Sequence, residues 1–212
     1  YKRAFANMLA DRPNSAAGTA AKLTMGTALQ VLRVNAGGTA LEWAAASGGS
    51  GVNSKLVSAT YTRPADTNVY AAGDVFAGST SAAVILSFAN FASANAAGAI
   101  IKSAQLVYST APATKPDFEL WLFDTTVTMQ NDNAAWAPSD AEMLTCVGKI
   151  PFPAGAFSVA GANGVIDVDG LEKLVTCAAA STTIYGILVI RNAFTPASGD
   201  VATVRLQILQ TP

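Results

Sequence analysis

Apolar and polar residues alternate along much of the chain with the two-residue period of β-strands. The last segment, 201–209, is the clearest case, because polar residues separate four apolar ones: Ala202, Val204, Leu206 and Ile208. Such alternation predicts a strand with one buried face and one exposed face. The segment 184–190, IYGILVI, is instead apolar on both faces. We therefore expect it at the centre of a sheet or against a partner chain.

Strand-like patterns recur after residue 53, and clusters of Gly, Pro, Asn and Asp separate them. The predicted strands are 55–62, 69–76, 82–88, 99–109, 117–123, 143–150, 164–168, 171–177, 182–191 and 201–209. No long segment has the 3.6-residue period of a helix, although Ser139 and Glu142 have the spacing of a capping box and predict a helical turn at 140–143. The pattern predicts an all-β protein, a jelly-roll-like antiparallel sandwich of about 8–10 strands with an extended N-terminal β arm.

The first 46 residues differ from the rest, because they are rich in small residues and carry only one strand-like pair. A strand is predicted at 29–34, a turn at 35–38 and a returning strand at 39–43. The SGGSG sequence that follows is typical of a flexible linker. We therefore expect an attachment or oligomerisation arm at 1–46, a linker at 47–53 and a β-sandwich body at 54–212.

The predicted hairpin needs a partner surface, because an isolated two-stranded hairpin is marginally stable in water. A symmetric oligomer supplies that surface, since three arms around one axis bury their apolar side chains together. Burial of each such side chain contributes roughly 1.5–3 kcal/mol. The candidate interface consists of six residues: Leu29, Val31, Leu32, Val34, Leu41 and Trp43.

Charge argues against nucleic-acid and membrane partners. The chain has 13 Lys and Arg against 14 Asp and Glu, so its formal net charge is -1 and no long-range field attracts a polyanion. The uncharged stretch 81–101 contains Asn90, Asn95, Gly98 and three serines, which is poor material for a membrane span. Charged residues form only 13% of the chain and hydrophobic residues 51%, a balance that predicts extensive burial against other chains.

Candidate chemistry is sparse. The chain contains no histidine, which removes Ser-His and Cys-His nucleophile arrangements and the usual zinc ligand sets. Cys146 and Cys177 are isolated, and we expect buried free thiols, in keeping with assembly in a reducing cytoplasm. Asp117, Glu119 and Asp124 are the best candidates for a carboxylate pair, but a solvated strand face also explains them.

The loop around Asn131, Asp132 and Asn133 superficially resembles a calcium-binding loop. It lacks the acidic residue at the twelfth position and the glycine at the sharp turn, so a turn held by Asx hydrogen bonds is the better explanation. We expect Trp136, in the same loop, to pack on its own domain or on a neighbour. These observations predict a protein that is not an enzyme and has no cofactor or metal site.

Two stretches resemble structural proteins of tailed bacteriophages. QVLRVNAGGTALEWA, at 30–44, is similar to a short segment of tail-fibre, collar and other appendage proteins, and KPDFELWLFDTTVTMQNDNAAWAPSDAEMLTCVGKIPF, at 115–152, is similar to the central part of head or appendage proteins. The resemblance implies a virion structural protein, commonly a homotrimer, with a jelly-roll-like body that decorates a capsid or attaches to an appendage. Its implied partners are itself and other virion proteins, such as major capsid or appendage proteins, in a virion assembled in the host cytoplasm.

Two functions follow as alternatives. The first is a capsid decoration or head-fibre-type protein that binds other virion subunits through its arm by surface area and strand addition. The second is a tail-fibre or host-facing receptor- or carbohydrate-binding module, in which loop aromatics such as Trp136, Tyr108 or Tyr61 stack on a sugar. Aromatic residues exposed together at one tip would favour the second alternative.

Overall fold

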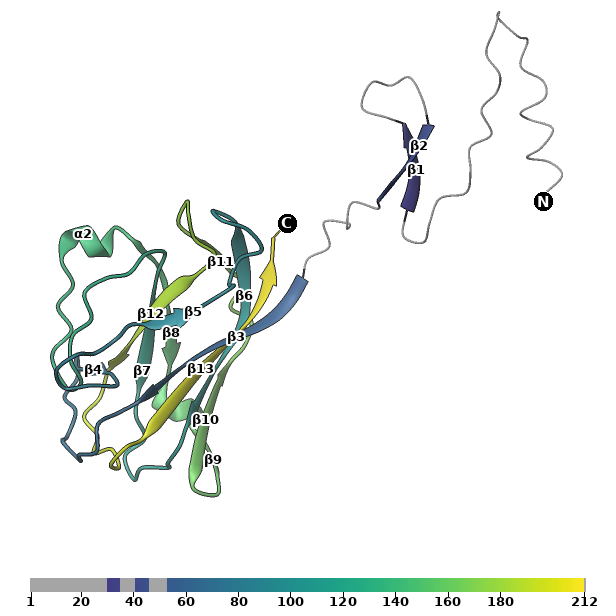
Figure 1. The fold of residues 1–212 in the computed structure, drawn as a ribbon. Coiled ribbons are helices and arrows are strands. Elements are labelled where there is room, and N and C mark those ends of the chain that lie inside the picture. Colours follow the sequence, from purple (N-terminus) through teal and green to yellow (C-terminus); the bar gives the residue numbers. More distant parts are fainter. Residues whose placement is uncertain (1–29, 35–40, 46–52, 212) are drawn as a thin grey trace, which may run out of the picture. The chain divides into compact units, whose positions relative to one another are not determined.

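The computed structural model describes residues 30–34, 41–45 and 53–211 (Figure 1). The chain divides into two units, Tyr1–Gly49 and Ser50–Pro212. In the first unit, β1 (Gln30–Val34) and β2 (Leu41–Ala45) form an antiparallel two-stranded sheet. Both strands of the predicted hairpin are therefore present. The predicted turn at 35–38 and residues 39–40 of the predicted returning strand lie outside the described residues. So does the predicted linker at 47–53, except for Asn53, which is the first residue of β3.

The second unit is built from two antiparallel sheets. The first sheet contains β3 (Asn53–Thr62), β6 (Gly98–Tyr108), β9 (Ser158–Ala160), β10 (Asn163–Val168), β11 (Lys173–Thr176) and β13 (Val201–Gln210). The second sheet contains β4 (Val75–Phe76), β5 (Leu86–Phe88), β7 (Phe118–Phe123), β8 (Cys146–Phe152) and β12 (Ile184–Ile190). A helical turn, α2 (Asp140–Met143), and a 3-10 turn, Ala154–Ala156, lie between strands.

The strand order is that of a jelly roll. The first sheet runs β3-β13-β6-β10-β9, with β11 also on β6, and the second runs β4-β12-β7-β8, with β5 also on β12. When β4 and β5 count as one interrupted strand and β9 to β11 as another, the first strand pairs with the last, the second with the second-last, and so on inward to β7 with β8. This nested pairing is one long hairpin rolled into two sheets. The predicted jelly-roll-like sandwich is confirmed.

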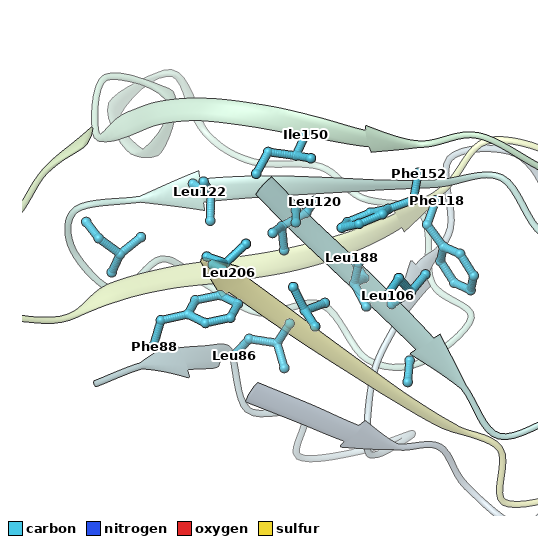
Figure 2. Packing of buried hydrophobic residues seen from close by; sticks show 14 of the residues in the cluster. Leu86, Phe88, Leu106, Phe118, Leu120, Leu122, Ile150, Phe152, Leu188 and Leu206 are labelled. Atoms are coloured by element: carbon cyan, nitrogen blue, oxygen red, sulfur yellow. The ribbon is translucent and has the colours of Figure 1, made fainter. Parts of the chain in front are cut away.

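The main core lies between the inner faces of the two sheets (Figure 2). Leu106 and Leu206 from the first sheet and Leu120 and Leu188 from the second are fully buried there. The alternation predicted for the last strand is confirmed, since its four even-numbered apolar residues are buried and Arg205 is exposed. The alternation of apolar and polar residues in β13 therefore reflects the burial of only one of its two faces.

A second, smaller core covers the outer face of the second sheet. It consists of Val75, Ala77, Phe123, Ile187 and Val189. Partly buried residues from the irregular segments at 83–85 and 127–136 pack against it. Because β12 lies between β7 and the β4–β5 edge and is covered on both faces, its continuous apolar sequence is explained within the unit. The expected position of 184–190 at a sheet centre is confirmed.

Two predicted strands are much shorter than expected. Within 69–76 only Val75–Phe76 is a strand, because the Asp74 carboxylate accepts a hydrogen bond from the Ala71 amide at 2.6 Å and Gly73 has φ +101°, which forms a turn. Within 82–88 only Leu86–Phe88 is a strand, because Ser79 Oγ accepts hydrogen bonds from the amides of residues 81 and 82. Side-chain capping of the backbone ends the sheet pairing in both places.

The predicted helical turn at 140–143 is present with its capping box. The Ser139 hydroxyl accepts a hydrogen bond from the Glu142 amide at 3.3 Å, and the Glu142 carboxylate accepts one from the Ser139 amide at 2.8 Å. These bonds and the Thr128 amide hold the pKa of Glu142 well below its usual value, at about 2. The strand predicted at 143–150 therefore begins only at Cys146.

Candidate functional site

The candidate interface predicted from the sequence falls on the β1–β2 hairpin. The register places Leu32 opposite Trp43 and Val34 opposite Leu41. Because positions two apart share one face of a strand, these two apolar pairs belong to the same face of the ribbon. Leu41 is 56% exposed and Trp43 is partly buried. The hairpin thus brings four of the six candidate residues together in two neighbouring cross-strand pairs.

The remaining candidate residues are placed differently. Val31 lies opposite Ala44, next to the Leu32–Trp43 pair in the register, and therefore belongs to the opposite face of the ribbon. Arg33 lies opposite Glu42, which places one cation and one anion at facing positions. Leu29 lies outside the described residues. The apolar character of the hairpin is therefore concentrated on one face rather than divided equally between both.

Glu119 is not part of a solvated strand face, so that expectation is wrong. Its side chain is buried on the outer side of β7, where Oε1 accepts a hydrogen bond from Lys149 Nζ at 2.6 Å. Oε2 accepts hydrogen bonds from Trp121 Nε1 at 2.9 Å and from Arg191 Nε at 2.8 Å. Both cations also lie over the Trp121 ring, at 5.4 and 6.0 Å from its centroid. The carboxylate is neutralised by neighbours from β7, from β8 and from the residue that follows β12.

The carboxylates around β7 do not form an open catalytic pair. Burial alone raises the pKa of Glu119, but the hydrogen bonds from Lys149, Arg191 and Trp121 outweigh it and hold the pKa below its usual value. Burial, followed by repulsion from Glu119, raises the pKa of Asp117. Both oxygens of Glu119 are already occupied. Asp124 follows the far end of the strand, about 20 Å from Asp117 along the chain direction.

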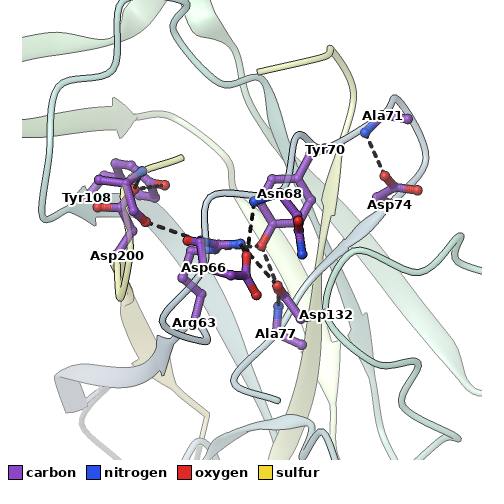
Figure 3. Close-up of polar contacts among 11 residues, drawn as sticks. Arg63, Asp66, Asn68, Tyr70, Ala71, Asp74, Ala77, Tyr108, Asp132 and Asp200 are labelled. Atoms are coloured by element: carbon purple, nitrogen blue, oxygen red, sulfur yellow. Dashed lines mark hydrogen bonds and ion pairs between the residues drawn. The ribbon is translucent and has the colours of Figure 1, made fainter. Parts of the chain in front are cut away.

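The loop at 131–133 is held by long-range contacts rather than by local Asx bonds, which corrects the prediction for Asp132. The Asp132 carboxylate is buried, and its Oδ1 accepts hydrogen bonds from Tyr70 Oη at 2.5 Å and the Ala77 amide at 2.9 Å (Figure 3). Its Oδ2 lies 3.5 Å from Arg63 Nη2. Burial raises the pKa of Asp132, and these partners offset only part of that shift. Its oxygens therefore anchor distant segments of the fold.

Arg63 is the centre of this polar cluster, and its side chain is fully buried. Its guanidinium donates to the Asp66 carboxylate at 2.7 Å, to Tyr70 Oη at 3.2 Å, and to the carbonyls of Asp66 and Ala197. It therefore ties together the loops that follow β3, precede α2 and precede β13 (Figure 3). No motif in the sequence marks Arg63. The only local signal was an acidic residue three positions later.

Asp200 extends the polar cluster to the neighbouring strand end. Its carboxylate is buried and accepts hydrogen bonds from Tyr108 Oη at 2.7 Å and the Ala197 amide at 2.8 Å (Figure 3). Burial, reinforced by the bond to Asp200, raises the pKa of Tyr108. The charged groups of the cluster are hydrogen-bonded to one another and to nearby backbone groups. The cluster therefore stabilises the loops at one end of the sandwich.

The aromatic residues proposed to stack on a sugar are not gathered at an exposed tip. Tyr61 and Tyr108 are buried in the main core, so these two residues do not supply the sugar-stacking surface of the second alternative. Trp136 packs on its own domain as expected, with its ring centroid 4.5 Å from that of Trp121. Both tryptophans are partly buried against the second core, so they do not form an exposed aromatic platform.

Grooves also lie on the surface of the described part of the body. One is polar and lies on the outer face of the first sheet, where Arg205 donates to Gln105 at 3.3 Å and Gln105 donates to Asp167 at 2.8 Å. Another has a volume of about 350 Å³ and lies between the C-terminal half of β3 and the segment 78–87. Its lining contains no charged residue: Ala59, Thr60, Tyr61, Thr62, Gly78, Ser79, Ala82, Val84, Ile85, Leu86 and Ser87.

Neither a metal-binding group nor a membrane-spanning helix is found in the described part of the chain. Within residues 30–34, 41–45 and 53–211, no three Cys, Asp or Glu side chains gather as metal ligands, and no helix has the length and apolar character to cross a bilayer. Both cysteines are free; Cys177 is buried, and Cys146 is partly buried. Burial raises the pKa of the Cys177 thiol.

Comparison with known proteins finds no matching family model and no matching curated protein. Similar solved structures come from virus particles. The infectious bursal disease virus VP2 subviral particle has a TM-score of 0.31 and 8% identity, over 90% of this chain and 46% of that chain. A marine algae virus of the order Picornavirales has a TM-score of 0.24 and 12% identity, over 93% and 84%. Israeli acute paralysis virus has a TM-score of 0.25 and 12% identity, over 94% and 80%.

Proposed function

We propose that the chain is a non-enzymatic virion structural protein whose β-sandwich body decorates a virus particle. In this proposal residues 1–46 are an attachment and oligomerisation arm, and the body is 54–212. Three copies associate through their arms and bind other virion proteins. The resemblance of 30–44 and 115–152 to tailed-bacteriophage proteins supports a capsid decoration or head-fibre type.

One observation carries most of this proposal: among the residues that the structure describes, β1 and β2 form a two-stranded sheet, and they belong to the unit Tyr1–Gly49 rather than to the body. Such a sheet is marginally stable by itself in water, so its order requires further contacts. Its two apolar cross-strand pairs provide a surface for those contacts, and Leu41 is more than half exposed. A host-facing sugar-binding role has weaker support, because Tyr61 and Tyr108 are buried.

Removal of the arm tests the proposal. A chain starting at residue 51 should remain a folded β protein by circular dichroism, but light scattering should give the mass of a single copy where the full chain gives three. It should also lose binding to the particle. An unchanged mass together with unchanged particle binding would refute the role of the arm.

A point substitution separates the arm from the body. In the full chain, Leu41→Glu places a carboxylate among the apolar pairs and should lower the mass measured by light scattering. Leu144→Glu is the matched control, because Leu144 is 88% exposed at the end of α2 and is already in water. Equal loss of mass in both variants would argue against a specific role of the hairpin.

A further inference from the structure

The first sheet of the body ends at an open strand edge. Among the described residues, β3 pairs only with β13, and the register runs through ten residue pairs without a bulge. In an antiparallel strand, every second residue directs its N–H and C=O away from the partner strand. The outer edge of β3 therefore carries a row of backbone donors and acceptors without a sheet partner.

This edge lacks the features with which proteins usually prevent strand addition. Residues 53–62 contain no proline and one charged residue, Lys55. The Lys55 ammonium donates to the Asn90 carbonyl at 3.1 Å, so it is held at the N-terminal end of the strand. Natural edge strands are commonly protected by charges, prolines or bulges. The C-terminal half of β3 has no charge, proline or bulge; the segment 78–87 lies beside it, with the Leu86 amide donating to Tyr61 Oη at 2.9 Å, and leaves a groove between them.

The uncharged groove lies along this half of β3. Buried Tyr61 contributes from β3, and Val84, which is 73% exposed, contributes from the segment opposite. A strand added to β3 here would gain backbone hydrogen bonds and place alternate side chains against Val84 and Ile85. The absence of charge in the lining favours an uncharged or internally neutralised occupant with apolar residues at alternate positions.

We propose that the β1–β2 hairpin of a second copy docks on this edge and continues the first sheet. This inference rests on the proposed arm function and names the surface that the arm binds. The hairpin fits the chemistry of the groove, because its cation Arg33 is registered opposite its anion Glu42. The cross-strand pairs on either side of this charged pair are apolar. The hairpin strands pair in the register Gln30–Ala45 to Val34–Leu41, and in this proposal the outer edge of one of them adds to β3.

The short connector between β2 and β3 favours a hairpin from a second copy over the hairpin of the same chain as the occupant of the groove. Seven residues connect β2 to β3, and the groove begins six residues further along β3, at Ala59. The connector spans at most about 25 Å, so a hairpin of the same chain would have to double back almost fully extended. Each copy gives one hairpin and receives another, and such head-to-tail contacts close into a ring when the rotation is one third of a turn.

Substitution in the full chain tests the docking surface. Val84→Glu places a carboxylate in the groove and should weaken association about tenfold or more, measured as a concentration-dependent fall in mass by light scattering. Leu174→Glu is the matched control, because Leu174 is 62% exposed on β11 and does not line the groove. The control should retain the wild-type mass.

The outcomes distinguish this inference from the proposed function. A wild-type chain that is a single copy at all concentrations refutes both. A wild-type oligomer that Leu41→Glu dissociates and Val84→Glu leaves intact refutes the docking surface and leaves the arm function standing. Loss of mass in both Leu41→Glu and Val84→Glu, with the wild-type mass in Leu174→Glu and unchanged circular dichroism spectra, supports the docking surface.

Cross-linking identifies the occupant directly. A photoreactive amino acid at position 84 of isotopically heavy full chain, mixed with light chain, should form heavy–light products that mass spectrometry maps to residues 30–45. The same amino acid at position 174 should give no such product. Products confined to one copy, or products that map to a body strand, would overturn the proposal.

Discussion

Gly186 illustrates how tightly the main core is packed at the level of single residues. A Cβ atom at this position would lie 2.9 Å from Leu120 Cδ1 and 3.0 Å from Phe88 Cε2. Gly186→Ala should therefore lower the free energy of unfolding by about 1–3 kcal/mol, as overpacking of a well-filled core does. Urea denaturation of the full chain measures this change.

Gly155 provides the control for that substitution. No atom lies within 4 Å of a Cβ added there, and the residue belongs to an exposed 3-10 turn. Gly155→Ala should change the free energy of unfolding by less than about 0.5 kcal/mol. Equal effects of the two alanines would show that the core is looser around Gly186 than its contacts indicate.

Glu119 should confer pH-dependent stability. The folded protein lowers the pKa of Glu119. Its contribution to the free energy of unfolding is therefore present above the ordinary pKa of a glutamate, about 4.3, and is lost as pH falls through the lowered pKa of the folded state. Glu119→Gln should cost about 1–3 kcal/mol at pH 7, because Lys149 and Arg191 lose their anion. The difference from wild type should narrow in acid, where the wild-type carboxyl also becomes neutral.

Denaturant titrations at pH 7 and at pH 3 measure this effect. Glu172→Gln is the control, because Glu172 and its partner Lys102 form an exposed ion pair of small expected value. A constant difference between Glu119→Gln and wild type at both pH values would contradict the assigned role of the ion cluster.

Among the structural elements, the three loops at one end of the sandwich depend on Arg63. Arg63→Met removes the cation and leaves the Asp132 carboxylate buried with Tyr70 and Ala77 alone. Loss of one member of a buried pair costs about 3–5 kcal/mol, so the variant should unfold at markedly lower denaturant. Adding Asp132→Asn removes the isolated charge and should recover part of the loss. A double variant no more stable than Arg63→Met would contradict the coupling.

The regular elements were predictable from the sequence where one core determines the pattern. The strand 201–209 alternates because only one of its faces is buried, and 184–190 is continuously apolar because cores cover both faces. The strands predicted at 69–76 and 82–88 failed because the Asp74 and Ser79 side chains bond to the backbone and form turns. Hydrogen bonds from the backbone to these side chains compete with strand pairing, and the alternation of apolar and polar residues does not predict them.

The polar sites were less predictable, because their partners are distant in sequence. Glu119 is neutralised by Lys149 and Arg191, which join it only once β7, β8 and β12 have assembled. Arg63 and Asp132 are separated by 69 residues. In contrast, the Ser139–Glu142 capping box is local, and its prediction is confirmed. The two strands of the β1–β2 hairpin are also close in sequence, and both were predicted.

At the scale of the whole molecule, the nested strand pairing makes local stability uneven. Amides of β12 should exchange with deuterium most slowly, because this strand is central in its sheet and buried on both faces. Amides of β3 should exchange faster when the arm is removed, since its outer edge then loses the proposed strand partner. Hydrogen exchange with mass spectrometry on the full chain and on residues 51–212 compares the two. Equal protection of β3 in both would argue against docking at this edge.

The central claim, that this protein works as a component of a virus particle, is tested most directly by cryo-electron microscopy of virions that carry it. We expect density for the β-sandwich body on the particle, in groups of three, with arms converging where the group meets other virion subunits. Particles that lack this density, or sandwiches exposed at a host-facing tip without arm contacts to the particle, would contradict the account.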